Sequence, residues 1–504
     1  MRRYRGAAAL LVVALVAAAC SGAKKEEAAP NLESGAAGST VPTGSGEGAG
    51  EATADTSVPD PAAAADPNAP LAADGGAAPS AGATPAAPGG GTGSAPTPAP
   101  GAAPGPGSAP APGAAAPEVQ LFNGAANTRG ITANEIRICG HAALTYGPAF
   151  NATADDFNVY YQAINDAGGI HGRKIVATYE NDNYDPATAV QAAEACRDKS
   201  PFFILGGIGF DQIPSVRNWA ESNKELYFHH IATVRGSENK RFSYTTQPTV
   251  ERVGQAFGEL AASRFKSKKI GILYRNSEFW QPGYDAFQKV AKERGLKVVR
   301  AVPVEKNQAN YVQALVALRN AGAEVVFGWE NTLALTQMVK QAKAQGYSPQ
   351  WLAFPFNLTS QTLGDEAMTP PMVGLATWPG YSKGDYGGSF APYANDMKLF
   401  EAQYRKYRPN TDIGGVAGDL LWLNWIEQKR LVEMLRACGP DCTRNRLAGL
   451  LANGYKATTS PTCPLDFSGG RHDGSGGLLN LMETYRSPSG KVNWRSPALC
   501  RSSF

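Results

Sequence analysis

Two groups of residues have the types that bind metal ions, but their spacing argues against a metal site. His229 and His230 are adjacent in a predicted strand, where successive side chains point to opposite faces. Residues 180–185 are rich in the carboxylate and amide oxygens that calcium prefers. They lack the central glycine of a calcium loop, and Pro186 directly after them is suited to begin a helix. We therefore expect no metal ion.

Patterns for nucleotide binding and covalent catalysis are incomplete as well. The glycines of residues 206–209 approach a dinucleotide-binding signature, but Gln212 stands where its last glycine belongs. No GxSxG or HExxH motif is present, and no serine or cysteine is placed with a histidine and an acid as nucleophilic catalysis requires. We expect neither a cofactor nor catalysis, and an exported hydrolase is kept as the least favoured alternative.

Cys20 ends a segment with the features of a secretion signal. Arg2, Arg3 and Arg5 precede an apolar run at residues 6–19, which is too short to span a bilayer. The run ends Ala-Ala-Ala-Cys at 17–20 and resembles a bacterial lipobox, in which the cysteine is lipidated and becomes the new N-terminus. Ordinary cleavage with an unmodified Cys20 is the alternative. We expect a lipoprotein signal peptide at 1–20 and a chain that works outside the cytoplasmic membrane, anchored to it through Cys20.

Composition divides the rest of the chain into two parts. Residues 21–117 are mainly Ala, Gly, Pro, Ser and Thr, which cannot bury enough apolar surface to fold. We expect a disordered tether there and a folded domain at 118–504. That domain exceeds the size of one core, so two lobes are predicted. The net charge is only +3 and the basic residues are spread evenly, so no nucleic-acid partner is expected.

Six cysteines remain for the folded domain: Cys139, Cys196, Cys438, Cys442, Cys463 and Cys500. An even number in an exported chain favours disulfides. The predicted pairs are Cys139–Cys196, Cys438–Cys442 and Cys463–Cys500. A zinc site is the alternative, and it is disfavoured because no CxxC pair exists and only His472 lies near these cysteines.

Strand and helix patterns alternate through most of the domain, which is typical of parallel sheets covered by helices on both faces. The first run predicts strands at 135–139, 173–179, 202–208 and 226–231, and helices at 154–167, 186–198 and 213–222. The second run predicts strands at 269–274, 297–304, 324–329 and 351–354, and helices at 250–265, 283–294, 311–321 and 332–345. Two helices at 395–407 and 415–437 precede a tail predicted to be irregular. In such sheets ligands bind beyond the carboxyl ends of the strands, so the loops after strands should carry the function.

Five segments in or beside those loops resemble the type I periplasmic binding proteins of the leucine/isoleucine/valine-binding group, which deliver solutes to ABC importers. They are YGP at 146–148, INDAGGIHG at 164–172, DNYDP at 182–186, LGG at 205–207 and CPLDF at 463–467. The resemblance covers roughly residues 131–495. It implies an α/β fold of two doubly wound parallel-sheet lobes joined by a multi-crossover hinge. We place lobe 1 at about 131–249 and 375–455, and lobe 2 at about 250–374 and 456–504.

The same resemblance implies which residues of the first lobe contact a ligand. Tyr146 stands where the family has an aromatic residue facing the ligand. Gly209, Phe210 and Asp211 occupy the loop in which amino-acid binders hold the ligand's carboxylate with a serine and backbone groups. Residues 231–233 match the second ligand loop, where a backbone carbonyl and a threonine hydroxyl hold the ammonium and the carboxylate. Ile231 and Thr233 are therefore candidates, although Thr233 could instead be a helix-capping residue.

From the second lobe, Trp280 stands where the family has a tyrosine over the ligand, and Trp329 and Glu330 follow a predicted strand. Phe356 and Asn357 lie near the position of the acid that pairs with an α-ammonium group. That acid is absent here, and Glu330, one strand away, is its candidate replacement. Because these residues are rich in aromatic rings, the cavity is suited to a larger or more aromatic ligand than a standard α-amino acid.

The resemblance implies a monomeric, extracytoplasmic lipoprotein without catalytic activity or cofactor. It would bind an amino acid or a related amide or aromatic metabolite and deliver it to ABC permease subunits in the membrane. A ligand-sensing co-receptor with the same fold is the principal alternative, because it would use the same residues.

Overall fold

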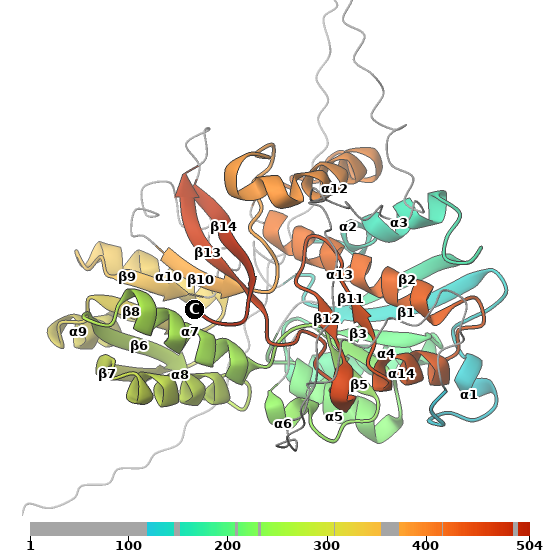
Figure 1. Ribbon diagram of the computed structural model, residues 1–504, viewed down its shortest axis with the longest axis horizontal. Helices are drawn as coiled ribbons and strands as arrows, with labels where there is room; N and C mark the ends of the chain where they lie inside the picture. The colour runs from blue at the N-terminus through green and yellow to red at the C-terminus, as the bar shows by residue number, and fades with distance from the viewer. Residues whose placement is uncertain are drawn as a thin grey trace, which may run out of the picture. The chain divides into compact units, whose positions relative to one another are not determined.

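The computed structural model describes residues 118–145, 152–206, 210–229, 233–306, 308–353, 372–415, 417–486 and 492–504. Its strands form two large sheets, here called the first and the second sheet, and one small hairpin (Figure 1). Along these ranges the chain passes between the two large sheets three times: after β5, after β10 and before β13.

The first sheet is entirely parallel, with strand order β2-β1-β3-β4-β5. Helices α4 and α5 pack together against this sheet, whereas α3 contacts β2 and packs against α12 and α13 (Figure 1). Its strands are β1 (Glu135–Ala142), β2 (Lys174–Asn181), β3 (Phe203–Gly206), β4 (Tyr227–His229) and β5 (Ser243–Thr245). Its helices are α1 (Ala125–Thr128), α2 (Ala154–Phe157), α3 (Val159–Asp166), α4 (Pro186–Asp198), α5 (Ile213–Asn223) and α6 (Val234–Ser237).

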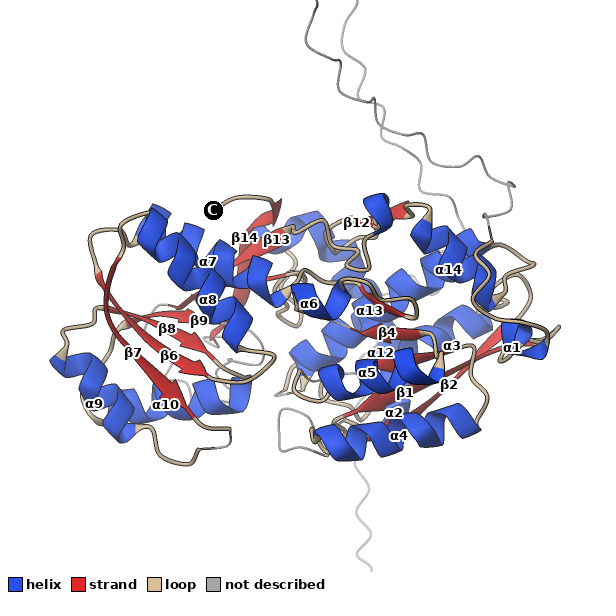
Figure 2. Cartoon of the chain, turned by 90° about the horizontal axis from the view of Figure 1, so that it is seen from below, coloured by secondary structure: helices blue, strands red, loops and turns tan. Residues whose placement is uncertain are grey.

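The second sheet has the order β14-β13-β10-β9-β8-β6-β7. Helices α7 and α8 cover one face and α9 and α10 the other (Figure 2). The strands are β6 (Lys269–Arg275), β7 (Lys297–Val304), β8 (Val325–Trp329), β9 (Gln350–Ala353), β10 (Met372–Ala376), β13 (Leu479–Arg486) and β14 (Val492–Arg501). The helices are α7 (Val250–Arg264), α8 (Gln281–Glu293), α9 (Val312–Asn320) and α10 (Thr332–Ala344).

The remaining elements are η3 (Gly388–Tyr393), α12 (Ala394–Tyr407), α13 (Gly418–Cys438), α14 (Arg444–Ala452), β11 (Lys456–Ala457), β12 (Leu465–Asp466) and η4 (Ser468–Gly470). β11 pairs with β12 in the small hairpin. The segment after β12 contacts the first sheet, because Asp473 forms a bridge with Thr245 and the Phe467 ring lies 6.3 Å from that of Tyr244.

The alternating pattern of the sequence predicted most of these elements. The apolar face that predicts a helix at 154–167 is buried, but the helix is interrupted at Asn158, which ends α2. Asp185 caps α4 by accepting from the backbone N–H groups of Ala187 and Thr188, as the Asp-Pro pair predicts.

The prediction of an irregular C-terminal tail is wrong, because β13 and β14 add an antiparallel pair to the edge of the second sheet beside β10. Asn480 interrupts the apolar pattern from which a strand at β13 could have been predicted. It is fully buried, and its side-chain oxygen accepts from the Cys500 N–H at 2.9 Å. A polar residue within an apolar segment favours the prediction of a loop, unless the residue on the neighbouring strand that satisfies its hydrogen bonds is known.

Two of the three predicted disulfides are present. Cys139 in β1 is bonded to Cys196 in α4, and Cys438 is bonded to Cys442. The predicted Cys463–Cys500 bond is wrong for this structure, in which both residues are free thiols. Their sulfur atoms lie 3.4 and 3.8 Å from the same oxygen, Oδ1 of Asn480, so this carbonyl serves as hydrogen-bond acceptor for both.

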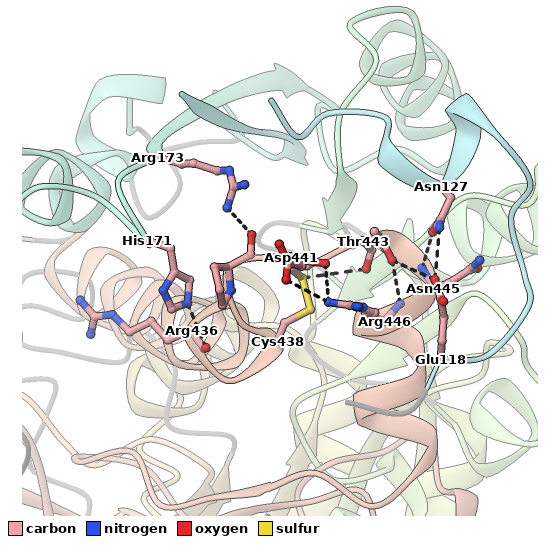
Figure 3. The surroundings of a disulfide bond; sticks show 12 residues. Glu118, Asn127, His171, Arg173, Arg436, Cys438, Asp441, Thr443, Asn445 and Arg446 are labelled. Atoms are coloured by element: carbon pink, nitrogen blue, oxygen red, sulfur yellow. Dashed lines mark hydrogen bonds and ion pairs between the residues drawn. A yellow bond between two sulfur atoms is a disulfide. The ribbon is translucent and has the colours of Figure 1, made fainter. Parts of the chain in front are cut away.

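The Cys438–Cys442 disulfide lies in a turn that fastens distant parts of the chain (Figure 3). The carbonyl of Pro440 in this turn accepts from Arg173 at 2.6 Å, which ties the start of β2 to the end of α13. Thr443 caps α14, and its hydroxyl donates to the carboxylate of Glu118 at 3.3 Å. The first described residue of the folded domain is therefore held at the disulfide-closed turn.

Candidate functional site

Loops that follow β3 and β6, in different sheets, meet through Asp211. Its carboxylate forms an ion pair with Arg275, the last residue of β6, and accepts from the indole N–H of Trp280 at 3.2 Å. The neighbouring Phe210 ring stacks on Phe279, with centroids 5.5 Å apart and planes 11° apart. Charged and aromatic side chains thus gather at the carboxyl ends of parallel strands, where ligands bind in folds of this kind.

Arg275 is the buried centre of an ion cluster, here called the Arg275 cluster, which also contains Asp211, Glu330 and the exposed Lys306. The Arg275 side chain is 4% exposed, and its Nε lies 3.1 Å from Oε2 of Glu330. Lys306, just after β7, lies 3.7 Å from Asp211. Burial lowers the pKa of Arg275, but the carboxylates of Glu330 and Asp211 outweigh burial, so the pKa is raised overall. The guanidinium is therefore firmly charged and balanced.

Glu330 follows β8 and has no exposed side-chain surface. Burial raises the pKa of its carboxyl to about 7, against the opposing charge of Arg275 and a hydrogen bond from the Asn331 N–H at 2.8 Å. The sequence-based interpretation assigned Glu330 to a ligand ammonium group. In this structure its charge partner is Arg275, a residue of the chain itself.

A second buried arginine, Arg217 of α5, lies at a neighbouring contact. Its side chain is 4% exposed, and its Nη2 is 3.9 Å from the carboxylate of Glu278 in the loop after β6. The guanidinium packs on Gly236 in α6, since a Cβ at Gly236 would lie 2.3 Å from Nη1. Burial lowers the pKa of Arg217, and the charge of Glu278, with smaller contributions from Tyr227 and Glu221, opposes this. The loops after β4 and β6 therefore both contact this side chain.

The other predicted residues within the described ranges have mainly structural contacts. Thr233 is buried and caps α6, since its Oγ1 accepts from the Gly236 N–H at 2.9 Å. Trp329 is buried behind Trp280: its indole N–H donates to the Trp280 carbonyl at 2.7 Å, and the two rings meet edge to face at 5.4 Å. The predicted residues Tyr146, Gly209, Ile231, Phe356, Asn357 and Cys20 lie outside the described residues.

Sequence reasoning missed three cations of the site. Arg275 and Lys306 stand at or just after strand ends, so the rule that strand ends carry the function would have found both. Lys306 also donates to the Tyr184 carbonyl, in the loop after β2, at 3.2 Å. Arg217 lies inside a helix, where an arginine is usually solvent-exposed, and no local signal distinguishes it.

A buried hydrogen-bond chain supports the loop that contains Asp211. The ring nitrogens of His141 in β1 lie 2.8 Å from Asp182 and 2.8 Å from the hydroxyl of Tyr227. Asp182 also accepts from Gln212, the residue after Asp211, at 3.1 Å. All these side chains are buried, so the chain of hydrogen bonds is suited to holding the loop and not to contacting a substrate.

A sequence profile of the periplasmic binding protein family matches residues 122–478, which is most of the chain. The chain belongs to this family. Among curated relatives, "Leu/Ile/Val-binding protein homolog 1" of Brucella abortus (strain 2308) is 23% identical over 247 residues. That match covers 47% of this chain and 64% of the relative, just under two thirds of its length.

Solved structures show the same fold. The fatty acid ABC transporter substrate-binding protein from Thermomonospora curvata matches with a TM-score of 0.60 and 17% identity, over 74% of this chain and 94% of that one. A solute-binding protein of an ABC transporter from R. palustris, in complex with 4-hydroxybenzoate, matches with a TM-score of 0.58 and 15% identity, over 72% and 96%. Among the described residues, no helix combines the length and apolar character needed to cross a membrane.

Proposed function

We propose that this chain is an extracytoplasmic solute-binding lipoprotein that captures a small molecule between its two lobes and delivers it to an ABC importer. The solute is an amino acid or a related amide or aromatic metabolite. Membership of the periplasmic binding protein family supports the class. The observation that carries the proposal is the meeting of Asp211 with Arg275 and Trp280, which joins strand ends of the two sheets.

The side chains at this meeting point suit a solute with a planar or apolar body and a polar group. Phe210 is half-buried, stacks on Phe279 and meets the edge of Trp280 at 5.5 Å, so an aromatic surface lines the contact. The named ligands of the relatives are leucine, isoleucine and valine, fatty acid, and 4-hydroxybenzoate. All are carboxylic acids that carry an apolar or aromatic body.

Lipid anchoring of the chain through Cys20 is part of the same proposal. Lipidation of Cys20 would hold the receptor at the membrane, and residues 21–117 would act as its tether. A tether keeps a binding protein at high effective concentration near its membrane partner, which free diffusion would not. Mass spectrometry of the N-terminal peptide is expected to show a diacylglyceryl group on Cys20, and loss of uptake in cells lacking the chain would distinguish import from sensing.

Thermal unfolding with a panel of amino acids, aromatic acids, fatty acids and their amides tests binding. A ligand at 100 times its Kd stabilises the folded state by about 2.7 kcal/mol, so at least one compound should raise the melting temperature. Phe210→Ala should remove this rise. Trp219→Ala is the matched control, because Trp219 lies on α5 but stacks with Arg197. A well-folded wild type that no compound stabilises would contradict the proposal.

A further inference from the structure

Arg217 differs from the other buried arginines of the described ranges in its partners. Arg430 pairs with Glu427 and donates to Thr462 and to two backbone carbonyls, and Arg444 pairs with Glu225. Arg275 pairs with Asp211 and Glu330. Each of these three guanidinium groups is balanced by a carboxylate that is itself 10% exposed or less.

The charge of Arg217 has no such balance within the described part of the chain. Its Nε and Nη1 atoms are buried without a hydrogen-bond partner among the described residues. The same two atoms of Arg275 also lack one, so the difference between the two arginines lies in the buried carboxylates that pair with Arg275. Its carboxylate neighbour, Glu278, lies 3.9 Å away and is 74% exposed, so solvent screens the pair. A guanidinium taken out of water without partners costs several kcal/mol. Folding alone does not explain why an arginine occupies this position.

The surroundings of Arg217 place its guanidinium beside the candidate site. It packs on Gly236 three residues after Thr233, in the segment that follows β4, and faces Glu278 in the segment that follows β6. The same segment after β6 contains Trp280, whose indole N–H donates to Asp211 of the Arg275 cluster. Thr233 uses its oxygen as an acceptor for the Gly236 N–H, so its hydroxyl proton remains for a second hydrogen bond.

We propose that Arg217 binds the carboxylate group of the solute and makes the protein selective for acids over their uncharged derivatives. A carboxylate can accept from two guanidinium nitrogens at once, and such charge-assisted bonds are strong in a buried position. The Thr233 hydroxyl is placed to donate to the same group. The weak contact with Glu278 is given up at little cost. This inference rests on the proposed function and names the chemical class of its solute.

Calorimetric titration with matched acids and amides tests it. The probes are 4-hydroxybenzoate and 4-hydroxybenzamide, octanoate and octanamide, and L-leucine and L-leucinamide. Wild type should bind at least one acid ten-fold or more tightly than its amide. Arg217→Gln should weaken binding of that acid ten-fold or more and leave the amide unchanged, whereas Arg217→Lys should retain part of the preference. The control Arg235→Gln removes an exposed charge two residues from Thr233 and should change neither affinity.

A second variant keeps the charge but moves it: the added Cβ of Gly236→Ala would displace the guanidinium and should also reduce the preference for the acid. Gly236→Ala replaces Arg217→Gln as the test if the latter variant does not fold. Wild type that binds an amide as tightly as its acid overturns this inference and leaves solute binding standing. Acid selectivity that survives both variants overturns it as well. Wild type that binds none of the six probes overturns the assignment of acids, and if the wider panel also gives no stabilisation, the proposed function fails with it.

Discussion

Arg275 and Arg217 have equally buried side chains, each 4% exposed, and each contacts an acid carried by the other sheet. Arg275 has two buried carboxylates, and its pKa is raised; Arg217 has one exposed carboxylate at 3.9 Å, and its pKa is lowered. The same residue type therefore serves two purposes. Arg275 joins the two sheets through its pairing with buried carboxylates. Arg217 has no buried carboxylate partner among the described residues and is the proposed partner of the solute.

The largest expected effect is the loss of folding stability when Arg275 is replaced. Arg275→Met leaves Glu330 buried without its cation and leaves Asp211 with only the more distant and more exposed Lys306, which should lower the free energy of unfolding by about 3–5 kcal/mol. Urea unfolding followed by circular dichroism measures it. A loss below about 1 kcal/mol would show that the ion cluster contributes little and would remove the contrast with Arg217.

A smaller effect should appear in the dependence of stability on pH. The pKa of Glu330 is about 7 in the folded protein, against an ordinary value of 4.5, so the folded protein holds this proton more tightly than the unfolded chain does. The contribution is fully present below pH 4.5 and is lost as the pH rises through 7. The loss is about 3 kcal/mol at most, at 1.36 kcal/mol per pKa unit. Glu330→Gln should flatten the wild-type decline between pH 4.5 and 7. If the stability of Glu330→Gln fell with pH as steeply as that of the wild type, the pH dependence would arise from other groups.

The smallest effect is expected at Arg217. Arg217→Met removes a desolvated cation that has no buried carboxylate partner among the described residues, so the free energy of unfolding should be unchanged or raised by about 1 kcal/mol. The same urea titration compares it directly with Arg275→Met. A loss as large as that of Arg275→Met would mean that Arg217 is structural and would weaken the case for a solute contact.

The sequence predicted the fold well because the signals that define it are local. Apolar runs and helix caps, such as Asp185 before Pro186, specify each element without knowledge of the rest. β13 was missed because the burial of Asn480 depends on Cys500 of a neighbouring strand. The Cys463–Cys500 pair was predicted from order along the chain, which does not report that Asn480 accepts from both thiols.

For the same reason, the sequence predicted some of the residues that gather at the candidate site, while their contact with a solute remains a prediction. Phe210, Asp211, Trp280 and Glu330 follow strands, and all four lie in or beside the contact between the sheets. Their mutual pairing was not predictable, because the partner of each acid comes from a distant strand. The role proposed for Arg217 depends on the lack of a buried carboxylate near it among the described residues, and only a three-dimensional structure reveals this.

Hydrogen–deuterium exchange tests most directly where the solute binds. The probe is the panel compound that gives the largest rise in melting temperature, at a saturating concentration. We expect slower exchange in residues 210–217, 233–237 and 275–280 together, because the solute would contact the loops of both sheets. Unchanged exchange in all three segments, with protection elsewhere, would contradict a solute site at the contact between the two sheets.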